Sequence, residues 1–203
     1  MRPIIIGVVD YGMGNHASVI HSLRNLGFRV KISSHIDELM VADVLLLPGV
    51  GAFPAAMTAL HERGLVTFLK IRASEGLPLI GICLGMQLLA SSSHEFGRTA
   101  GLDLIPGEIV PFPGKASHIG WNTLEVVQGH PLCALSNGDV FYFNHSYYYQ
   151  GLPEYQVAST RYPMKFSSVI CKGNIYGVQF HPEKSQAAGR VFLNCLIRGL
   201  VDA

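Results

Sequence analysis

The chain is short of charge. Only 14% of its 203 residues are Asp, Glu, Lys or Arg, where about a quarter is usual in soluble proteins. The 15 basic and 14 acidic side chains nearly balance, giving a formal net charge of +1. No basic block and no acidic tail stands out, so we expect neither a nucleic-acid partner nor a charged disordered segment.

Cysteine and long hydrophobic runs are also scarce. The four cysteines form no CxxC pair and no zinc-type spacing, so we expect no metal site. The first apolar run, "IIIGVV", is too short to cross a bilayer, and no small-residue cleavage site follows it. These absences predict a protein of the reducing cytoplasm that does not contact membranes.

What is abundant is apolar sequence in short stretches. Hydrophobic residues make up 49% of the chain, and the mean hydropathy is +0.31. Many short apolar runs, as opposed to one long one, are typical of buried strands. The length predicts a single domain, 1–203, large enough to bury a substantial core.

The order of these runs predicts the fold class. Up to residue 83, apolar strands alternate with helical segments, which indicates a parallel sheet covered by helices. After residue 100, short strands follow one another with little helix between them, until a final helix over 186–200. We therefore predict an α/β fold: an open mixed sheet, with a parallel N-terminal part flanked by helices and an antiparallel extension. The expected helices of the first half span 15–27, 53–63 and 64–75.

The stretch "PLIGICLGMQLLA" (78–90) carries the clearest chemical signal. It places Cys83 between Gly81 and Gly85 at the joint of a strand and a helix, the cysteine form of the G-x-S-x-G nucleophile turn. The glycines predict close packing at the turn, and the helix N-terminus favours thiolate over thiol. The N–H of Leu84 is a natural donor to an oxyanion. A buried structural cysteine is the alternative, and the flanking glycines make it the weaker one.

A thiolate nucleophile needs a base and a group that orients the base. Among the nine histidines, His181 differs because it ends the apolar strand "IYGVQF" and is followed by Pro182 and Glu183. A parallel strand would deliver it to the same carboxyl edge of the sheet as Cys83, where open α/β folds hold their sites. Glu183 could then fold back and hold the imidazole tautomer.

The segments "GICLGMQLL" and "GVQFHPEKS" together resemble the class I, or triad-type, glutamine amidotransferases. The resemblance implies a flavodoxin-like fold, no cofactor, and hydrolysis of glutamine to glutamate and ammonia. It implies that Cys83 attacks the side-chain amide, His181 moves the proton and Glu183 orients His181. A thioester would form, and water would cleave it.

The same resemblance implies a set of substrate-binding residues. "PGVG" is similar to the family's mobile oxyanion strand, and glycines there would let a peptide plane turn its N–H toward the oxyanion. The expected substrate-binding residues are Gly49, Val50, Gly51, Leu84, Gln87, Glu95, Ser146 and Tyr147.

"DYGMGN", "GWN" and "HSYY" resemble a branch of the family whose ammonia passes through a channel to a (β/α)₈ cyclase subunit in histidine biosynthesis. The implied partner is therefore that cyclase, in a heterodimer. The residues expected at this interface are Asn15, His118, Trp121, Tyr142 and Lys184.

Several alternatives stay open. Ser117 and Asn144 depart from the usual pattern, in the direction of paralogues that supply ammonia for amidine formation on nucleotide-activated sugars in surface polysaccharide synthesis. "GMGNHA" (12–17) fits a dinucleotide-binding fingerprint, although Asp37 falls late for its acidic residue. A partner-free thiol hydrolase or peptidase and a catalytically silent regulatory subunit are further possibilities.

Overall fold

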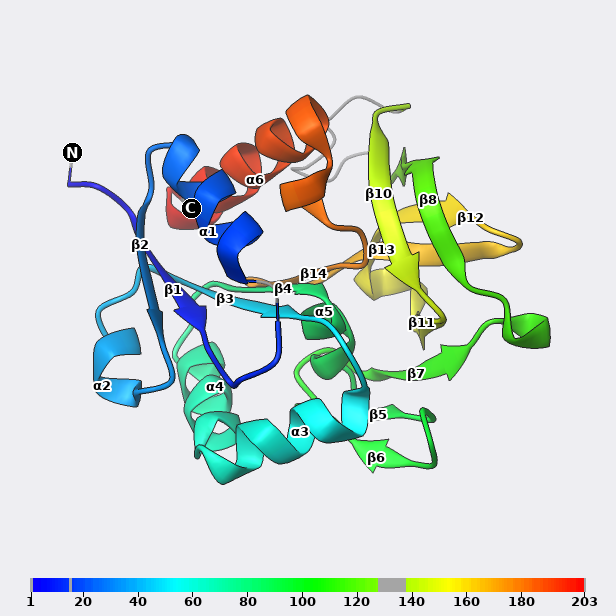
Figure 1. The fold of residues 1–203 in the computed structure, drawn as a ribbon, viewed down its shortest axis with the longest axis horizontal. Coiled ribbons are helices and arrows are strands. Elements are labelled where there is room, and N and C mark those ends of the chain that lie inside the picture. Colours follow the sequence, from blue (N-terminus) through cyan, green and yellow to red (C-terminus); the bar gives the residue numbers. More distant parts are fainter. Residues whose placement is uncertain (1, 15, 128–137, 203) are drawn as a thin grey trace.

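The computed structural model describes residues 2–14, 16–127 and 138–202, and its centre is a large mixed sheet (Figure 1). Five neighbouring strands in the order β2-β1-β3-β4-β14 run parallel. Their bounds are β1 Ile5–Val9, β2 Arg29–Ser33, β3 Val44–Gly49, β4 Leu79–Cys83 and β14 Ile175–Val178. The parallel part that the sequence predicts is confirmed, and its last strand comes from the far end of the chain.

The rest of the large sheet is almost entirely antiparallel. The path continues β13-β11-β7-β5-β6, with β12 attached to β13 and β9 attached to β12, and among these described strands only β5 and β7 pair in parallel. The bounds are β5 Ser92–Ser93, β6 Thr99–Ala100, β7 Gly107–Pro111, β9 Glu125–Val126, β11 Tyr147–Gly151, β12 Gln156–Arg161 and β13 Lys165–Lys172. The predicted antiparallel extension is thus confirmed.

Two of the later strands do not join that sheet. β8 (His118–Thr123) and β10 (Val140–His145) pair only with each other, which corrects the expectation that all the later strands extend one sheet. The run "FYFNHSYYY" is divided at Ser146 into β10 and β11. The buried face of β10 instead packs against aromatic side chains: the ring centroids of Phe141 and Phe180 lie 4.3 Å apart.

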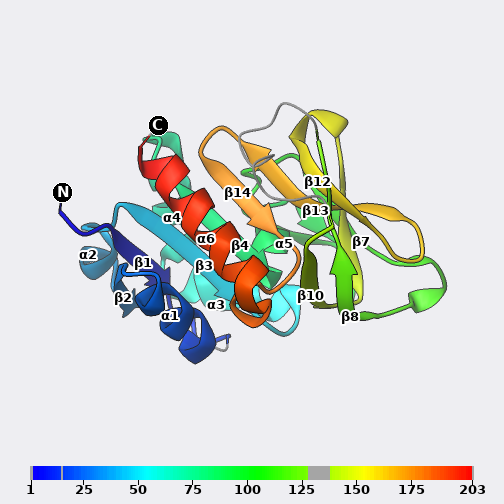
Figure 2. The same cartoon turned by 90° about the horizontal axis from the view of Figure 1, so that it is seen from above.

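The helices cover both faces of the parallel strands (Figures 1 and 2). α1 (His16–Asn25) and α6 (Gln186–Val201) lie on one face, and α3 (Phe53–Glu62), α4 (Leu65–Ser74) and α5 (Leu84–Leu88) lie on the other. The predicted helices are confirmed; α2 (Ile36–Leu39) is additional, because one turn is too short to show a periodicity. Among the described residues, no helix has the length and apolarity needed to cross a membrane.

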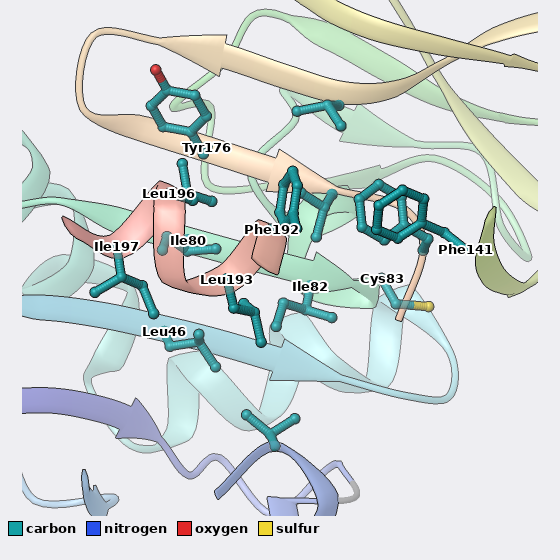
Figure 3. Packing of buried hydrophobic residues seen from close by; sticks show 14 of the residues in the cluster. Leu46, Ile80, Ile82, Cys83, Phe141, Tyr176, Phe192, Leu193, Leu196 and Ile197 are labelled. Atoms are coloured by element: carbon teal, nitrogen blue, oxygen red, sulfur yellow. The ribbon is translucent and has the colours of Figure 1, made fainter. Parts of the chain in front are cut away.

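The parallel strands divide the core into two layers. Side chains alternate across a strand, so Leu46, Ile80 and Ile82 meet α6 while their neighbours meet α3 and α4. Figure 3 shows the first layer, in which Phe192 and Leu193 of α6 pack over these strands. With both faces covered, the inner strands β1, β3 and β4 carry no charged side chain, and this explains the continuous apolar runs in the sequence. β2, at the edge of the sheet, instead exposes Arg29 and Lys31.

α5 lies unusually close to the sheet, and two glycines allow this. A Cβ added at Gly85 would overlap the carbonyl oxygen of Leu47 in β3, and a Cβ at Gly81 would press on the backbone of Gly85. The predicted close packing at this turn is therefore confirmed. It holds the start of α5 against the carboxyl ends of β3 and β4.

Gly85→Ala should destabilise the protein by about 3 kcal/mol or more, because neither backbone segment can move away. Gly199→Ala is the matched control: Gly199 lies in α6 with open space around it, so alanine should stabilise the helix by roughly 0.5–1 kcal/mol. Urea unfolding of both variants measures the difference. Equal stabilities for the two variants would contradict the steric argument.

Candidate active site

Cys83 occupies the joint that its sequence context predicts. It ends β4 and directly precedes α5, with a backbone φ of 55° and ψ of −110°. A positive φ is strained for a residue with a Cβ, and such strain persists only where the surroundings enforce it. The glycine-lined contact between α5 and β3 provides that enforcement, and it holds the thiol at the edge of the sheet.

His181 reaches the same edge by the route that the sequence predicts. β14 pairs in parallel with β4, with Val178 opposite Ile82, and His181 follows three residues later. Its Nδ1 lies 2.8 Å from Oε1 of Glu183, and both side chains are only 4% exposed. The structure therefore brings Cys83, His181 and Glu183 together.

The imidazole of His181 lies between the carboxylate of Glu183 and the sulfur of Cys83. Burial alone would lower the pKa of His181, but hydrogen bonds to Cys83 and Glu183 outweigh it and raise the pKa above its ordinary value. Because Nδ1 is used by Glu183, Nε2 is left for the sulfur. Such an arrangement can accept the thiol proton and keep the resulting imidazolium stable.

A pocket of about 260 Å³ opens beside the sulfur. Gly49 lies just outside it, opposite Cys83 in the pairing of β3 with β4, where it lines a smaller adjoining cavity. Every other expected substrate-binding residue lines the pocket. The lining residues are Val50, Gly51, Cys83, Leu84, Gln87, Glu95, Asn144, His145, Ser146, Tyr147, His181 and Lys184.

Two of these side chains are held by their neighbours. Oε2 of Glu95 accepts a hydrogen bond of 2.7 Å from the backbone N–H of Phe53, the first residue of α3. The side-chain NH₂ of Gln87 donates to the carbonyl of Tyr147 at 3.2 Å and to Oε1 of Gln179 at 3.1 Å. Both side chains are thereby fixed in position at the wall of the pocket.

Sequence reasoning gave no role in the site to three residues that lie there. Gln179, fully buried, has its Nε2 3.8 Å from Cys83 Sγ, and the carbonyl of Asn144 lies 3.9 Å from it. His145 lines the pocket from the end of β10. Only the position of Gln179 two residues before His181 could have pointed to it.

Among the described residues, no group of three or more His, Cys, Asp or Glu side chains is placed to hold a metal ion.

Three of the five expected interface residues form one exposed cluster beside the pocket. Trp121 is 49% exposed and its ring centroid lies 5.8 Å from that of Tyr142, while Lys184 Nζ lies 5.7 Å from the centroid of Tyr142. Asn15 lies outside the described residues.

His118 departs from this expectation. It is only 2% exposed, with its ring stacked between Phe143 and Tyr162, so it does not present a surface to a partner. The reason is that β8 alternates, and His118 points inward where Ile119 and Trp121 are the more exposed.

His118 is instead half of a buried histidine pair. Its Nδ1 lies 3.1 Å from Nε2 of His145, whose Nδ1 lies 2.8 Å from the carbonyl oxygen of Tyr147. Burial lowers the pKa of His118 to about 4 and that of His145 to about 3. Both imidazoles are therefore neutral near pH 7.

This burial makes stability depend on pH. In the unfolded chain, His118 binds a proton as the pH falls below its ordinary pKa of 6.5. In the folded protein it binds that proton only below about pH 4. The free energy of unfolding should therefore fall as pH drops through this window. His118→Gln should remove on the order of 2–3 kcal/mol of that fall, measured by urea unfolding across pH.

The matched control for this prediction is His21→Gln. His21 is exposed on α1 and bonds only its neighbour Asn25. Its replacement should leave the slope of stability against pH unchanged. An unaltered slope in His118→Gln would show that the buried imidazole does not control the pH dependence.

Comparison with known proteins agrees with this geometry. Two relatives carry the name imidazole glycerol phosphate synthase subunit HisH. The one from Bacillus licheniformis is 46% identical over 198 residues, 93% of this chain and 93% of its own. The one from Listeria innocua is 46% identical over 189 residues, 91% of each chain. The similarity therefore extends over nearly the whole length.

The fold agrees as well. A crystal structure of a glutamine amidotransferase superposes with a TM-score of 0.74 at 20% identity, covering 98% of this chain and 99% of the other. The profile of the family described as Glutamine amidotransferase class-I matches residues 7–197. These matches favour glutamine chemistry over the dinucleotide-binding alternative. The chain belongs to the class I glutamine amidotransferase family.

Proposed function

We propose that the chain is the glutaminase subunit of an imidazole glycerol phosphate synthase of the cytoplasm, with the active site and the partner surface on one domain, 1–203. The observation that carries the proposal is that Cys83 and His181 line one pocket, while Nδ1 of His181 lies 2.8 Å from Oε1 of Glu183. The near full-length similarity to proteins named as this subunit supports the choice of pathway.

The reaction starts with transfer of the Cys83 proton to Nε2 of His181. The sulfur attacks the side-chain amide carbon of glutamine and forms a tetrahedral intermediate. The C–N bond then breaks, and His181 returns the proton so that nitrogen leaves as ammonia. A water molecule, deprotonated by His181, attacks the thioester and releases glutamate, and the thiol is restored.

Two backbone segments are the candidates to bind the oxyanion of the intermediate. Leu84 is the first residue of α5, so its N–H has no acceptor within the helix. Val50 and Gly51 line the pocket on the opposite side, and Gly51 has a φ of 106°. Donation from Leu84 together with a turned peptide of this glycine-rich strand would stabilise the oxyanion.

The other end of glutamine meets polar groups farther along the pocket. Glu95 offers a carboxylate to the α-ammonium group. Since the NH₂ of Gln87 is used by Tyr147 and Gln179, Gln87 offers its carbonyl oxygen to an N–H of the substrate. The backbone of Ser146 and Tyr147 is the third contact, with the α-carboxylate group.

The ammonia passes to a cyclase subunit with a (β/α)₈ barrel, which forms imidazole glycerol phosphate and AICAR. The surface that meets this partner is the exposed cluster of Trp121, Tyr142 and Lys184. Trp121 supplies a large rigid apolar side chain of the kind that anchors interfaces. Lys184 adds a positive charge at the mouth of the pocket, where an acidic group of the partner can pair with it.

Cys83→Ala should lower glutamine hydrolysis at least ~10³-fold, because removing one member of a nucleophile–base unit removes the covalent route. Production of glutamate by the complex with the cyclase measures this. In the wild type, an electrophilic glutamine analogue should label Cys83 and leave exposed Cys195 unlabelled. Activity near that of the wild type in Cys83→Ala would refute the mechanism.

The pathway is tested by adding the cyclase subunit and its phosphoribosyl substrate, which should yield imidazole glycerol phosphate that depends on glutamine. Trp121→Ala should weaken assembly by about 2 kcal/mol or more, measured by titration calorimetry, while the labelling of Cys83 persists. If a sugar-amidating synthase is stimulated and the cyclase is not, the paralogue alternative replaces the histidine-pathway proposal.

A further inference from the structure

Gln179 is a fully buried polar residue beside the nucleophile, and the reaction described above makes no use of it. It directly follows β14 and lies two residues before His181. Its side-chain Nε2 lies 3.8 Å from the sulfur of Cys83, and its Oε1 lies 3.1 Å from Nε2 of Gln87. The carboxamide therefore bridges the sulfur and Gln87.

One backbone carbonyl determines which way this carboxamide faces. The carbonyl oxygen of Tyr147 can only accept hydrogen bonds, so Gln87 must present its NH₂ to it. The same NH₂ faces Gln179, which must therefore present its Oε1 to Gln87. The NH₂ group of Gln179 is then left facing Cys83.

The buried pair of His118 and His145 also binds the carbonyl of Tyr147, through a hydrogen bond from His145. Because Nδ1 of His145 donates to Tyr147, its Nε2 accepts from Nδ1 of His118. Nε2 of His118 in turn accepts from Nδ2 of Asn122 at 3.3 Å. With both imidazoles neutral, every donor in this series of hydrogen bonds points in one direction, from Asn122 toward the carbonyl of Tyr147.

We propose that Gln179 is a further catalytic residue of the glutaminase site, whose side-chain N–H donates to the sulfur of Cys83 and stabilises the thiolate before attack. A hydrogen bond to a charged acceptor is stronger than one to a neutral acceptor. The opposite orientation would place Oε1 against the thiolate and repel it. The proposal rests on the role of Cys83 as the nucleophile.

Loss of the Gln179 donor would favour the thiol form of Cys83 over the thiolate. The carbonyl of Asn144, 3.9 Å from the sulfur, accepts an S–H but cannot stabilise a thiolate. An uncharged substitution at Gln179 changes none of the titratable groups around the sulfur, so the pH dependence of sulfur reactivity then reports on the carboxamide. Those groups are His181, Glu183, Glu95, Lys184, His145 and Tyr11.

The test is alkylation of Cys83 by iodoacetamide across a range of pH, followed by mass spectrometry of the peptide that contains it. Exposed Cys195, in the same sample, is the internal reference thiol. Gln179→Met keeps the volume and adds no charge. It should slow Cys83 about 10-fold at neutral pH relative to Cys195 and move its profile about one unit to higher pH. Gln150→Met, at an exposed position of β11, should change neither quantity.

Gln179→Glu is the second variant, because it keeps the shape and the oxygen that accepts from Gln87. It should slow Cys83 further than methionine does, since a carboxylate oxygen replaces the donor and its negative charge disfavours a neighbouring thiolate. In the wild type, the side-chain amide proton of Gln179 should move downfield in NMR spectra with the same pH midpoint as the alkylation.

A pH-independent amide signal, or wild-type rate and profile in the folded variants, would overturn the proposal. Failure of the proposed function gives a different result. In that case the electrophilic glutamine analogue leaves Cys83 of the wild type unlabelled, whatever the residue at position 179.

Discussion

The close contact between α5 and the parallel strands is the constraint on which the site depends. Without side chains at Gly81 and Gly85, the helix begins directly against β3 and β4. Cys83 is then forced to a positive φ, and its sulfur stands at the carboxyl edge of the sheet and cannot turn into the core. The strained backbone of this one residue fixes the position of the sulfur, around which the other groups of the site are arranged.

The parallel and antiparallel parts of the sheet contribute different groups. Parallel pairing of β4 with β14 brings together a thiol and an imidazole that are far apart in the chain. The junction of β10 and β11 contributes the backbone carbonyls of Asn144 and Tyr147. The carbonyl of Tyr147 binds both Gln87 and His145, so it orders side chains from two elements, α5 and β10.

The proposed partner surface and His181 are neighbours. The backbone N–H of His181 donates to the carbonyl of Tyr142 at 2.8 Å, and the ring of Tyr142 contacts both Trp121 and Lys184. A partner that binds this cluster would therefore touch Tyr142 and Lys184, whose backbones are hydrogen-bonded directly to His181. Such proximity offers a short physical route by which assembly can influence the chemistry.

The amino-acid sequence by itself determined the α/β class and the strand–turn–helix at Cys83, because both are local patterns of apolar runs and glycines. It also determined the pairing of His181 with Glu183, because the two residues lie only two positions apart. It also identified most of the pocket through family resemblance. Tertiary structure alone decided that β8 and β10 leave the main sheet, that His118 is buried, and that Gln179 faces the sulfur. Those outcomes depend on which strands become neighbours and which way one carbonyl points, and contacts between residues distant in the chain set both.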